Sequence, residues 1–137
     1  MNNQGPEIKI DETNISEELA RQAGHFIYIA ECAVKAEAVY ETSKFSLDQK
    51  IATIDCQIRE RAVDDGKKIT EKQIEKEVEL HPGYKEAKIK TIKAKAEKEM
   101  WRARREAWYQ RSGLLVQMAI NQRSELDGLV SGRVKAA

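Results

Sequence analysis

The side chains best suited to catalysis are two histidines, His25 and His81, and a few acidic pairs. A catalytic histidine needs a base or a metal as its partner. Neither histidine follows a carboxylate by three residues, so the Glu-x-x-His ligand pattern of di-iron helical bundles is absent. The pair Asp64-Asp65 precedes Gly66, where solvation and a helix end explain it better than acid–base chemistry. We expect His25 to pack in or beside a helix seam and His81 to cap a helix.

Other reactive arrangements are missing as well. The sequence has no Gly-rich phosphate loop, no GxGxxG and no nucleophile elbow. The two cysteines, Cys32 and Cys56, match no metal-ligand spacing, and we interpret them as reduced, half-buried side chains. We therefore predict a protein that is not an enzyme and that needs neither a metal nor a cofactor.

Basic side chains gather in three groups that could contact an acidic partner. The groups are Arg59 with Arg61, Lys67 with Lys68, and the run 85–111, where Arg102, Arg104 and Arg105 lie between Trp101 and Trp108. Cations contact phosphates and aromatic rings stack on bases, so this pattern suits single-stranded nucleic acid. A solvated helix surface with packed tryptophans is the alternative interpretation, and the sequence leaves both open.

The net charge of +1 conceals an asymmetry along the chain. Residues 1–65 hold 7 Lys and Arg against 13 Asp and Glu, which gives −6, whereas residues 85–111 hold 10 against 4, which gives +6. Two helices that run antiparallel could partly neutralise each other, or the basic helix could keep a face for an acidic partner.

The elements that carry these groups are predicted to be helices. In 137 residues, 34% are charged and 6% aromatic, with only 7 glycines and 2 prolines, which favours long solvent-exposed helices over a strand-rich fold. No segment has the apolar length of a membrane span, and the first residues lack the pattern of a secretory signal. We expect an all-α fold of two long antiparallel helices joined by a short helix, a helical hairpin of the coiled-coil type.

The first long helix is predicted to begin after Ser16, a good N-cap residue, and to end at Asp64-Asp65-Gly66. Its apolar residues alternate in steps of three and four, which is typical of a coiled-coil seam. Glu37 and Lys44 occupy two positions of this seam. The seam consists of Leu19, Ala23, Phe26, Ala30, Ala33, Tyr40, Leu47, Ile51, Ile54 and Ile58.

A capping box formed by Thr70 and Gln73 predicts a short helix over about 71–80. Pro82 tolerates the first turn of a helix, so a third helix is expected from there to about Glu125. Residues 1–15 are expected to form a flexible arm and residues 127–137 a frayed tail. A single helical domain would then span residues 16–126.

Two apolar stripes follow this third helix. The first stripe is Tyr84, Ala87, Ala94, Trp101, Trp108 and Leu115; the second is Ile89, Ile92, Ala96, Met100, Ala103, Ala107, Leu114 and Met118. One antiparallel neighbour cannot cover both stripes. We therefore predict that the second stripe contacts another subunit.

The layout of residues 35–126 resembles that of the phage recombination mediators, the UvsY-like proteins. The similar segments are Gln57-Ile58-Arg59-Glu60-Arg61, then Asp64-Asp65-Gly66-Lys67-Lys68, then Ile69 to Val78, then His81-Pro82-Gly83-Tyr84, and last a long helix with Trp101 and Ala107 to Leu115. Within that last helix, Arg111-Ser112-Gly113 is the most telling local similarity.

The resemblance implies a small helical protein that forms a closed ring. It implies binding to single-stranded DNA and contacts with a RecA-type recombinase and a single-strand-binding protein, so that the recombinase is loaded in place of the latter. The family's DNA-binding stretch would match Gln57, Arg59 and Arg61, with Asp55 and Glu60 as departures. Lys67, Lys68 and the arginines of the third helix could share the work. The family's self-association region would match Leu114, Leu115, Met118 and Ile120, to which Trp108 is added.

A different class of function fits the same pattern. A helical scaffold or adaptor that binds only protein would explain the seam, the stripes and the charge asymmetry equally well. It predicts self-assembly without affinity for nucleic acid. For either function we expect a cytoplasmic location, which for a phage protein is the cytoplasm of the bacterial host.

Overall fold

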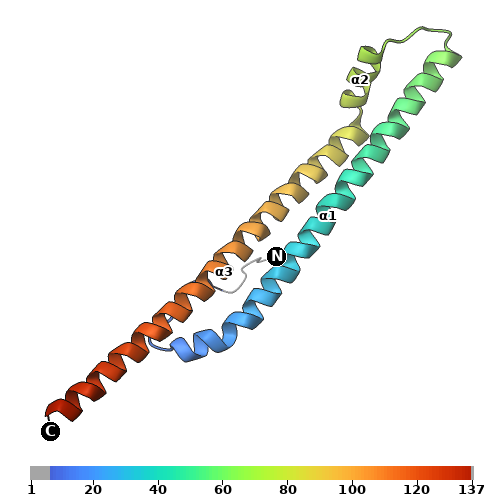
Figure 1. The fold of residues 1–137 in the computed structure, drawn as a ribbon. Coiled ribbons are helices and arrows are strands. Elements are labelled where there is room, and N and C mark those ends of the chain that lie inside the picture. Colours follow the sequence, from blue (N-terminus) through green and yellow to red (C-terminus); the bar gives the residue numbers. More distant parts are fainter. Residues whose placement is uncertain (1–6, 137) are drawn as a thin grey trace. The chain divides into compact units, whose positions relative to one another are not determined.

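A computed structural model describes residues 7–136, and all of its regular structure is helical. Helix α1 spans Ile15–Asp64, α2 spans Glu71–Leu80 and α3 spans Pro82–Ala136 (Figure 1). The two long helices have 50 and 55 residues, and the short one has 10. No strand occurs in the part of the chain that the structure describes. The predicted fold class, two long helices and one short helix, is confirmed at this level.

The ends of the helices follow the local sequence closely. Helix α1 ends in a Schellman arrangement, in which Lys67 N–H donates to the carbonyl of Ala62 at 2.9 Å and Gly66 N–H to that of Val63 at 3.1 Å. Gly66 has a φ of 65°, which L-residues with a side chain rarely adopt. At the start of α3, the Nδ1 of His81 accepts a hydrogen bond from Gly83 N–H at 3.0 Å. The predicted capping role of His81 is confirmed.

Two boundaries differ from the prediction. Helix α1 begins at Ile15, and α3 continues past Glu125 to Ala136. Gly128 and Gly132 each weaken a helix by about 1 kcal/mol relative to alanine, but neither has the positive φ that would end it. No proline follows to stop the helix, so α3 includes most of the residues predicted as a tail.

The contacts of the chain gather in two compact units. Among the described residues, unit 1 comprises 7–33 and 101–136, and unit 2 comprises 34–100. In unit 1, Gln22 contacts Trp108 and Glu12 contacts Gln122, so the N-terminal part of α1 and the C-terminal part of α3 run in opposite directions. In unit 2, Thr91 donates to the carbonyl of Ser43. Each unit therefore pairs a segment of α1 with a segment of α3.

The buried face of α1 in unit 1 repeats every seven residues through Ile15, Gln22 and Ile29. The predicted seam placed Ala23 there, which is exposed. In unit 2, α1 buries Ala36 and Ser43, which directly precede Glu37 and Lys44, the charged residues that interrupted the predicted seam. From Leu47 to Ile58 the predicted and observed positions coincide.

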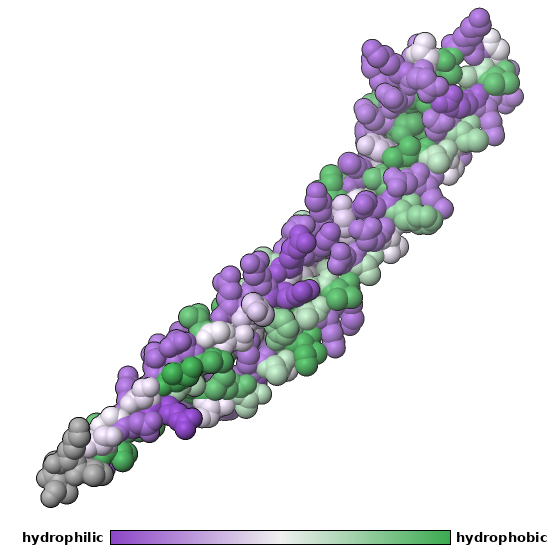
Figure 2. Space-filling model, in the orientation of Figure 1, coloured by the Kyte–Doolittle hydropathy of each residue, from purple (hydrophilic) through white to green (hydrophobic). Residues whose placement is uncertain are grey.

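The two stripes of α3 have different environments. The first stripe packs inside its own chain, with Ala94, Trp101, Trp108 and Leu115 all buried. Members of the second stripe face solvent: Ile89 is 53% exposed, Ile92 57% and Leu114 60%. On the face drawn in Figure 2, hydrophobic side chains form separate patches among hydrophilic ones. These members are not covered by their own unit, and the contact of the second stripe with another subunit stays a prediction.

Candidate nucleic-acid interface

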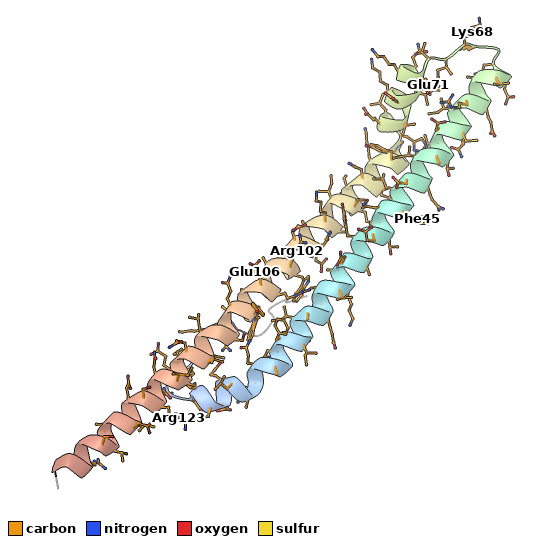
Figure 3. The ribbon with its side chains drawn as sticks, in the orientation of Figure 1. Phe45, Lys68, Glu71, Arg102, Glu106 and Arg123 are labelled. Carbon is orange, nitrogen blue, oxygen red and sulfur yellow. The ribbon has the colours of Figure 1, made fainter. Side chains whose placement is uncertain are left out.

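An open cleft of about 520 Å³ lies in unit 2 where α1 ends and α2 begins. Four cationic side chains line it, namely Arg61, Lys67, Lys68 and Lys76. Three of these four were predicted from the sequence as DNA contacts, and Lys76 is added by the structure. Lys68 lies in the loop that joins the two helices (Figure 3).

The elements around the cleft are held by a small apolar core. Ile54 and Ile58 of α1 pack against Ile74 and Val78 of α2, and all four are buried. A ten-residue helix is marginal on its own, so this contact is what fixes α2 beside α1. Arg61 and Lys76 thus project from two packed helices, and Lys67 and Lys68 project from the short loop that joins them.

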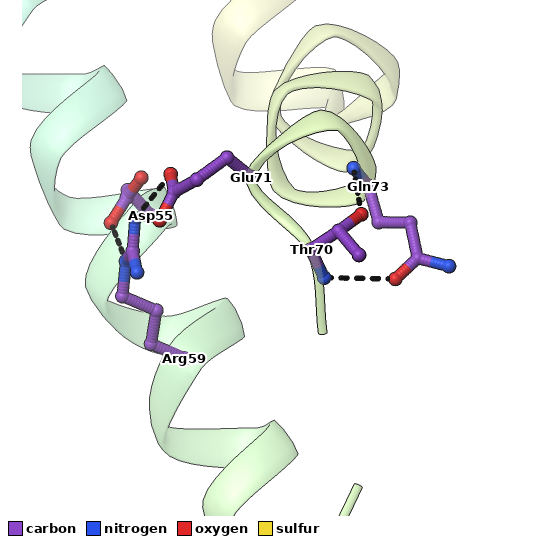
Figure 4. A network of polar contacts seen from close by, with 5 residues as sticks. All are labelled: Asp55, Arg59, Thr70, Glu71 and Gln73. Carbon is purple, nitrogen blue, oxygen red and sulfur yellow. Dashed lines mark hydrogen bonds and ion pairs between the residues drawn. The ribbon is translucent and has the colours of Figure 1, made fainter. Parts of the chain in front are cut away.

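Polar contacts complete the support of α2 (Figure 4). Gln73 N–H donates to the Thr70 hydroxyl at 3.3 Å, and Thr70 N–H donates to the Gln73 side-chain oxygen at 3.0 Å. The predicted capping box is confirmed. It satisfies two of the free amides at the start of α2.

The charge around the cleft is an excess of cations. Asp65 and Glu77 are the acidic residues of its lining, against the four cations. All four cations are exposed, and none of them makes an ion pair with any residue in the range 7–136. Cations that are not neutralised by the protein itself attract an anionic ligand, and their effect is strongest in a concave site.

Arg59 differs from its neighbour Arg61. Its Nε donates to Asp55 at 2.7 Å, and its Nη2 contacts both carboxylate oxygens of Glu71 at 3.0 and 2.8 Å (Figure 4). These hydrogen bonds, first of all those to Glu71, raise the pKa of Arg59 above its usual range. Arg59 therefore ties the first turn of α2 to α1, and its charge is balanced inside the protein.

The arginines of α3 lie in unit 1, and the two tryptophan rings that flank Arg102, Arg104 and Arg105 are covered. Trp101 is 5% exposed and Trp108 3%, so neither offers a face to a base. Arg104 lies 4.9 Å above the Trp101 ring, and His25 packs against Trp108 with the ring centres 5.3 Å apart. The packed alternative for both tryptophans is confirmed. Arg102 and Arg105 remain exposed.

The predicted oligomerisation residues divide into two sets. Trp108 and Leu115, at 3% and 0% exposure, are enclosed within unit 1 and present no surface to a second chain. Leu114 and Ile120 are 60% and 52% exposed, and Met118 is partly buried. Of the five predicted residues, these three have surface that their own unit leaves accessible.

A buried arginine, Arg111, is the residue whose role the sequence did not reveal. It is 4% exposed, and its guanidinium donates to the carbonyl of Ile8 at 2.8 Å, that of Lys9 at 3.1 Å and the Gln22 side chain at 2.7 Å. It also pairs with Glu18. Ile8 and Lys9, which belong to the arm of residues 1–15 predicted to be flexible, are thereby attached to α3; residues 1–6 of that arm lie outside the described residues.

Neighbouring side chains shift the pKa of Glu18 in unit 1 and the pKa of Cys56 in unit 2. The hydrogen bond from Arg111 lowers the pKa of Glu18. On α1 in unit 2, the negative charge of Glu60 raises the pKa of the Cys56 thiol. Both cysteines are free thiols; Cys32 is partly buried as predicted, but Cys56 is exposed because it faces away from the seam.

Within residues 7–136, no three His, Cys, Asp or Glu side chains are grouped so that they could hold a metal ion. None of the helices in that range is both long and apolar enough to cross a membrane. In comparisons with known proteins, no family model, no curated protein and no solved structure matches this chain.

Proposed function

We propose that this protein is a recombination mediator that binds single-stranded DNA and helps to load a RecA-type recombinase onto strands covered by a single-strand-binding protein. The observation that supports the proposal is the cleft with four cations, which make no ion pair with any residue in the range 7–136. The similarity of the helical layout to UvsY-like mediators points the same way. In this proposal the chain acts as a binding protein rather than as an enzyme, and it acts in the cytoplasm.

The cleft suits a flexible, single-stranded backbone. Arg61 and Lys76 come from two different helices, and Lys67 and Lys68 come from the loop between them. A strand without a rigid duplex geometry can bend to follow cations spread over a curved surface. Each such patch binds weakly, and several copies on one closed ring raise the overall affinity by their effective concentration. The proposal therefore includes a continuous α1–α3 hairpin and its assembly into a ring.

The test is fluorescence anisotropy of a labelled single-stranded oligonucleotide across a salt series, with duplex DNA as competitor. Each phosphate contact contributes about 0.7 to the slope of log K against log salt for a single strand. Changing Arg61, Lys67 and Lys68 together to alanine should lower that slope by about 2. Affinity for single strands should fall steeply, while the helical circular dichroism stays unchanged.

A matched pair on α2 sharpens the assignment. Lys76 lines the cleft, whereas Lys72, one turn earlier on the same helix and also exposed, does not. Lys76→Ala should weaken binding and Lys72→Ala should not. Arg59→Ala should loosen α2 and leave the salt slope nearly unchanged, since its charge is already paired. Equal effects of Lys72→Ala and Lys76→Ala would refute the cleft as the site.

The loading step needs its own assay. A recombinase added to DNA covered by a single-strand-binding protein hydrolyses ATP only after a lag, and the wild-type chain should shorten that lag. The triple variant of Arg61, Lys67 and Lys68 should not. A chain that binds single strands tightly yet leaves the lag unaltered would overturn the mediator role.

A protein-only scaffold is the second candidate. The observation that favours it is the exposed apolar stripe of α3, on which Ile89 and Ile92 are each more than half exposed. Sedimentation velocity that shows a stable oligomer, together with no binding to single strands even at low salt, would select the scaffold over the mediator.

A further inference from the structure

One aromatic side chain of unit 1 is exposed to solvent, whereas the two tryptophans are buried. Tyr109 of α3 is 70% exposed, while Trp101 and Trp108 on the same helix are covered. Residues three and four positions away are neighbours on a helix surface. For Tyr109 these are Arg105 and Glu106 before it and Ser112 and Gly113 after it.

The turn before Tyr109 carries an exposed arginine. Arg105 is exposed, and Arg102, a further turn back, is exposed as well (Figure 3 labels Arg102). Glu106 and, one turn before Arg102, Glu99 contribute negative charges to the same face, so Arg105 is the cation nearest to the ring. Side chains on an α-helix lean toward its N-terminus, so the ring of Tyr109 leans over the turn that carries Arg105.

The turn after Tyr109 leaves the other side of the ring open. Gly113 has no side chain, and a Cβ placed there would meet nothing within 4 Å. A glycine inside a helix is unfavourable by about 1 kcal/mol relative to alanine. No close contact among the described residues requires a glycine at this position, so packing does not explain it. The Ser112 hydroxyl donates to the carbonyl of Tyr109 and therefore stays close to the helix backbone.

We propose that Tyr109 is a stacking platform for a nucleobase of single-stranded nucleic acid, with Arg105 and Arg102 contacting the adjacent phosphates. This inference rests on the proposed function and extends it, because it adds a contact to bases in unit 1 to the phosphate contacts of the cleft in unit 2. Every base has a flat face, so a stacked ring binds strands without reading their sequence. That tolerance suits a protein that must act on any strand.

The test compares two oligonucleotides of equal length and equal phosphate charge, one of thymidines and one made only of abasic sites. Tyr109→Ala should weaken binding to the thymidine strand by about 5- to 150-fold, the range that corresponds to one stacked base. It should bind the abasic strand as the wild type does. Tyr109→Phe keeps the ring and should bind both strands like the wild type.

Two further variants separate stacking from a merely structural effect. Tyr28 of α1 lies in the same unit and is 52% exposed, but its helix neighbours include Glu31 and no arginine or lysine, so Tyr28→Ala should change neither affinity. Gly113→Gln should raise the melting temperature, since glutamine is the better helix former, yet weaken binding to the thymidine strand because its side chain covers the ring. Opposite signs for stability and binding would not arise from a packing defect.

The failure of this inference can be told apart from the failure of the proposed function. If wild-type protein binds neither strand, both are overturned. If the cleft variants weaken binding but Tyr109→Ala binds both strands normally, stacking alone is wrong. An equal loss on thymidine and abasic strands would also overturn it, since the ring would then act on something other than a base.

Discussion

Replacing Arg111 is the most decisive perturbation of unit 1. Its guanidinium donates hydrogen bonds to Ile8, Lys9 and Gln22, pairs with Glu18, and lies 4.6 Å from the centre of the Trp108 ring. At 4% exposure, none of these contacts is replaced easily by water. Removing one partner of a buried charged network costs about 3–5 kcal/mol.

Arg111→Ala should therefore lower the melting temperature of unit 1 by about 10–20 °C, at about 3–5 °C per kcal/mol for a chain of this size. Circular dichroism at 222 nm measures the shift. Hydrogen exchange should show lost protection at the start of α1 and little change in unit 2. Arg111→Met keeps much of the volume but none of the hydrogen bonds, so it should behave nearly as badly.

Arg105→Ala is the matched control, since Arg105 lies on the same helix and is exposed. An exposed substitution of this kind usually changes stability by less than about 0.5 kcal/mol. If Arg111→Ala melted within 2 °C of the wild type, the reasoning that the buried guanidinium organises unit 1 would be refuted.

Three further changes test other contacts. Because the pKa of Glu18 is lowered in the folded protein, its carboxylate stabilises the fold at pH values above the ordinary pKa of 4.5, and this contribution is lost as the pH falls through the lower, folded pKa. The free energy of unfolding should therefore drop on acidification. In an acid titration followed by circular dichroism, Glu18→Gln should flatten that pH dependence. Thr70→Ala removes the cap of α2 and should destabilise it by about 0.5–2 kcal/mol, seen as faster hydrogen exchange in residues 71–80, while exchange at the start of α1 stays as it was. Gly66→Ala forces a side chain into the left-handed region at a cost of about 1–2 kcal/mol, whereas Gly66→Asn should be milder; equal melting temperatures for the two variants would contradict this account of the turn.

Local signals allowed much of the fold to be predicted. Gly66, Thr70 with Gln73, and Pro82 each mark a boundary through backbone chemistry that needs no distant partner, and all of these boundaries are where they were expected. The C-terminal end of α3 was not predictable in this way, because a helical glycine and a terminating glycine look alike in sequence.

The seam was partly misplaced for a different reason. Gln22 and Ser43 are buried, and a search for apolar residues passes over both. The positions that face the partner helix advance in two steps of four from Ser43 through Leu47 to the partly buried Ile51, which shifts the pattern by the insertion known as a stutter. A seam fitted to the isoleucines near residue 54 therefore falls one position off before residue 47.

Which residues belong to the candidate site also depends on tertiary contacts. Arg59 and Arg61 are equivalent in the sequence, and only the position of Glu71 makes the first a structural residue. Trp108 and Tyr109 are adjacent, yet one is enclosed and the other is open. Which member of such a pair is available to a ligand is decided by the neighbouring helix.

The buried contact between Gln22 and Arg111 also selects the alignment of its two helix segments. If α1 were displaced by one heptad in unit 1, Ile15 or Ile29 would take the place of Gln22, and a buried guanidinium would lose its amide partner. Apolar heptads alone permit such offsets, and a single buried polar pair is known to exclude them in coiled coils. The contact from Thr91 to the carbonyl of Ser43 has no such selectivity, since every residue provides a carbonyl. The contact between Gln22 and Arg111 thus disfavours pairings of the two helix segments that are shifted by a heptad, whether within a chain or between copies.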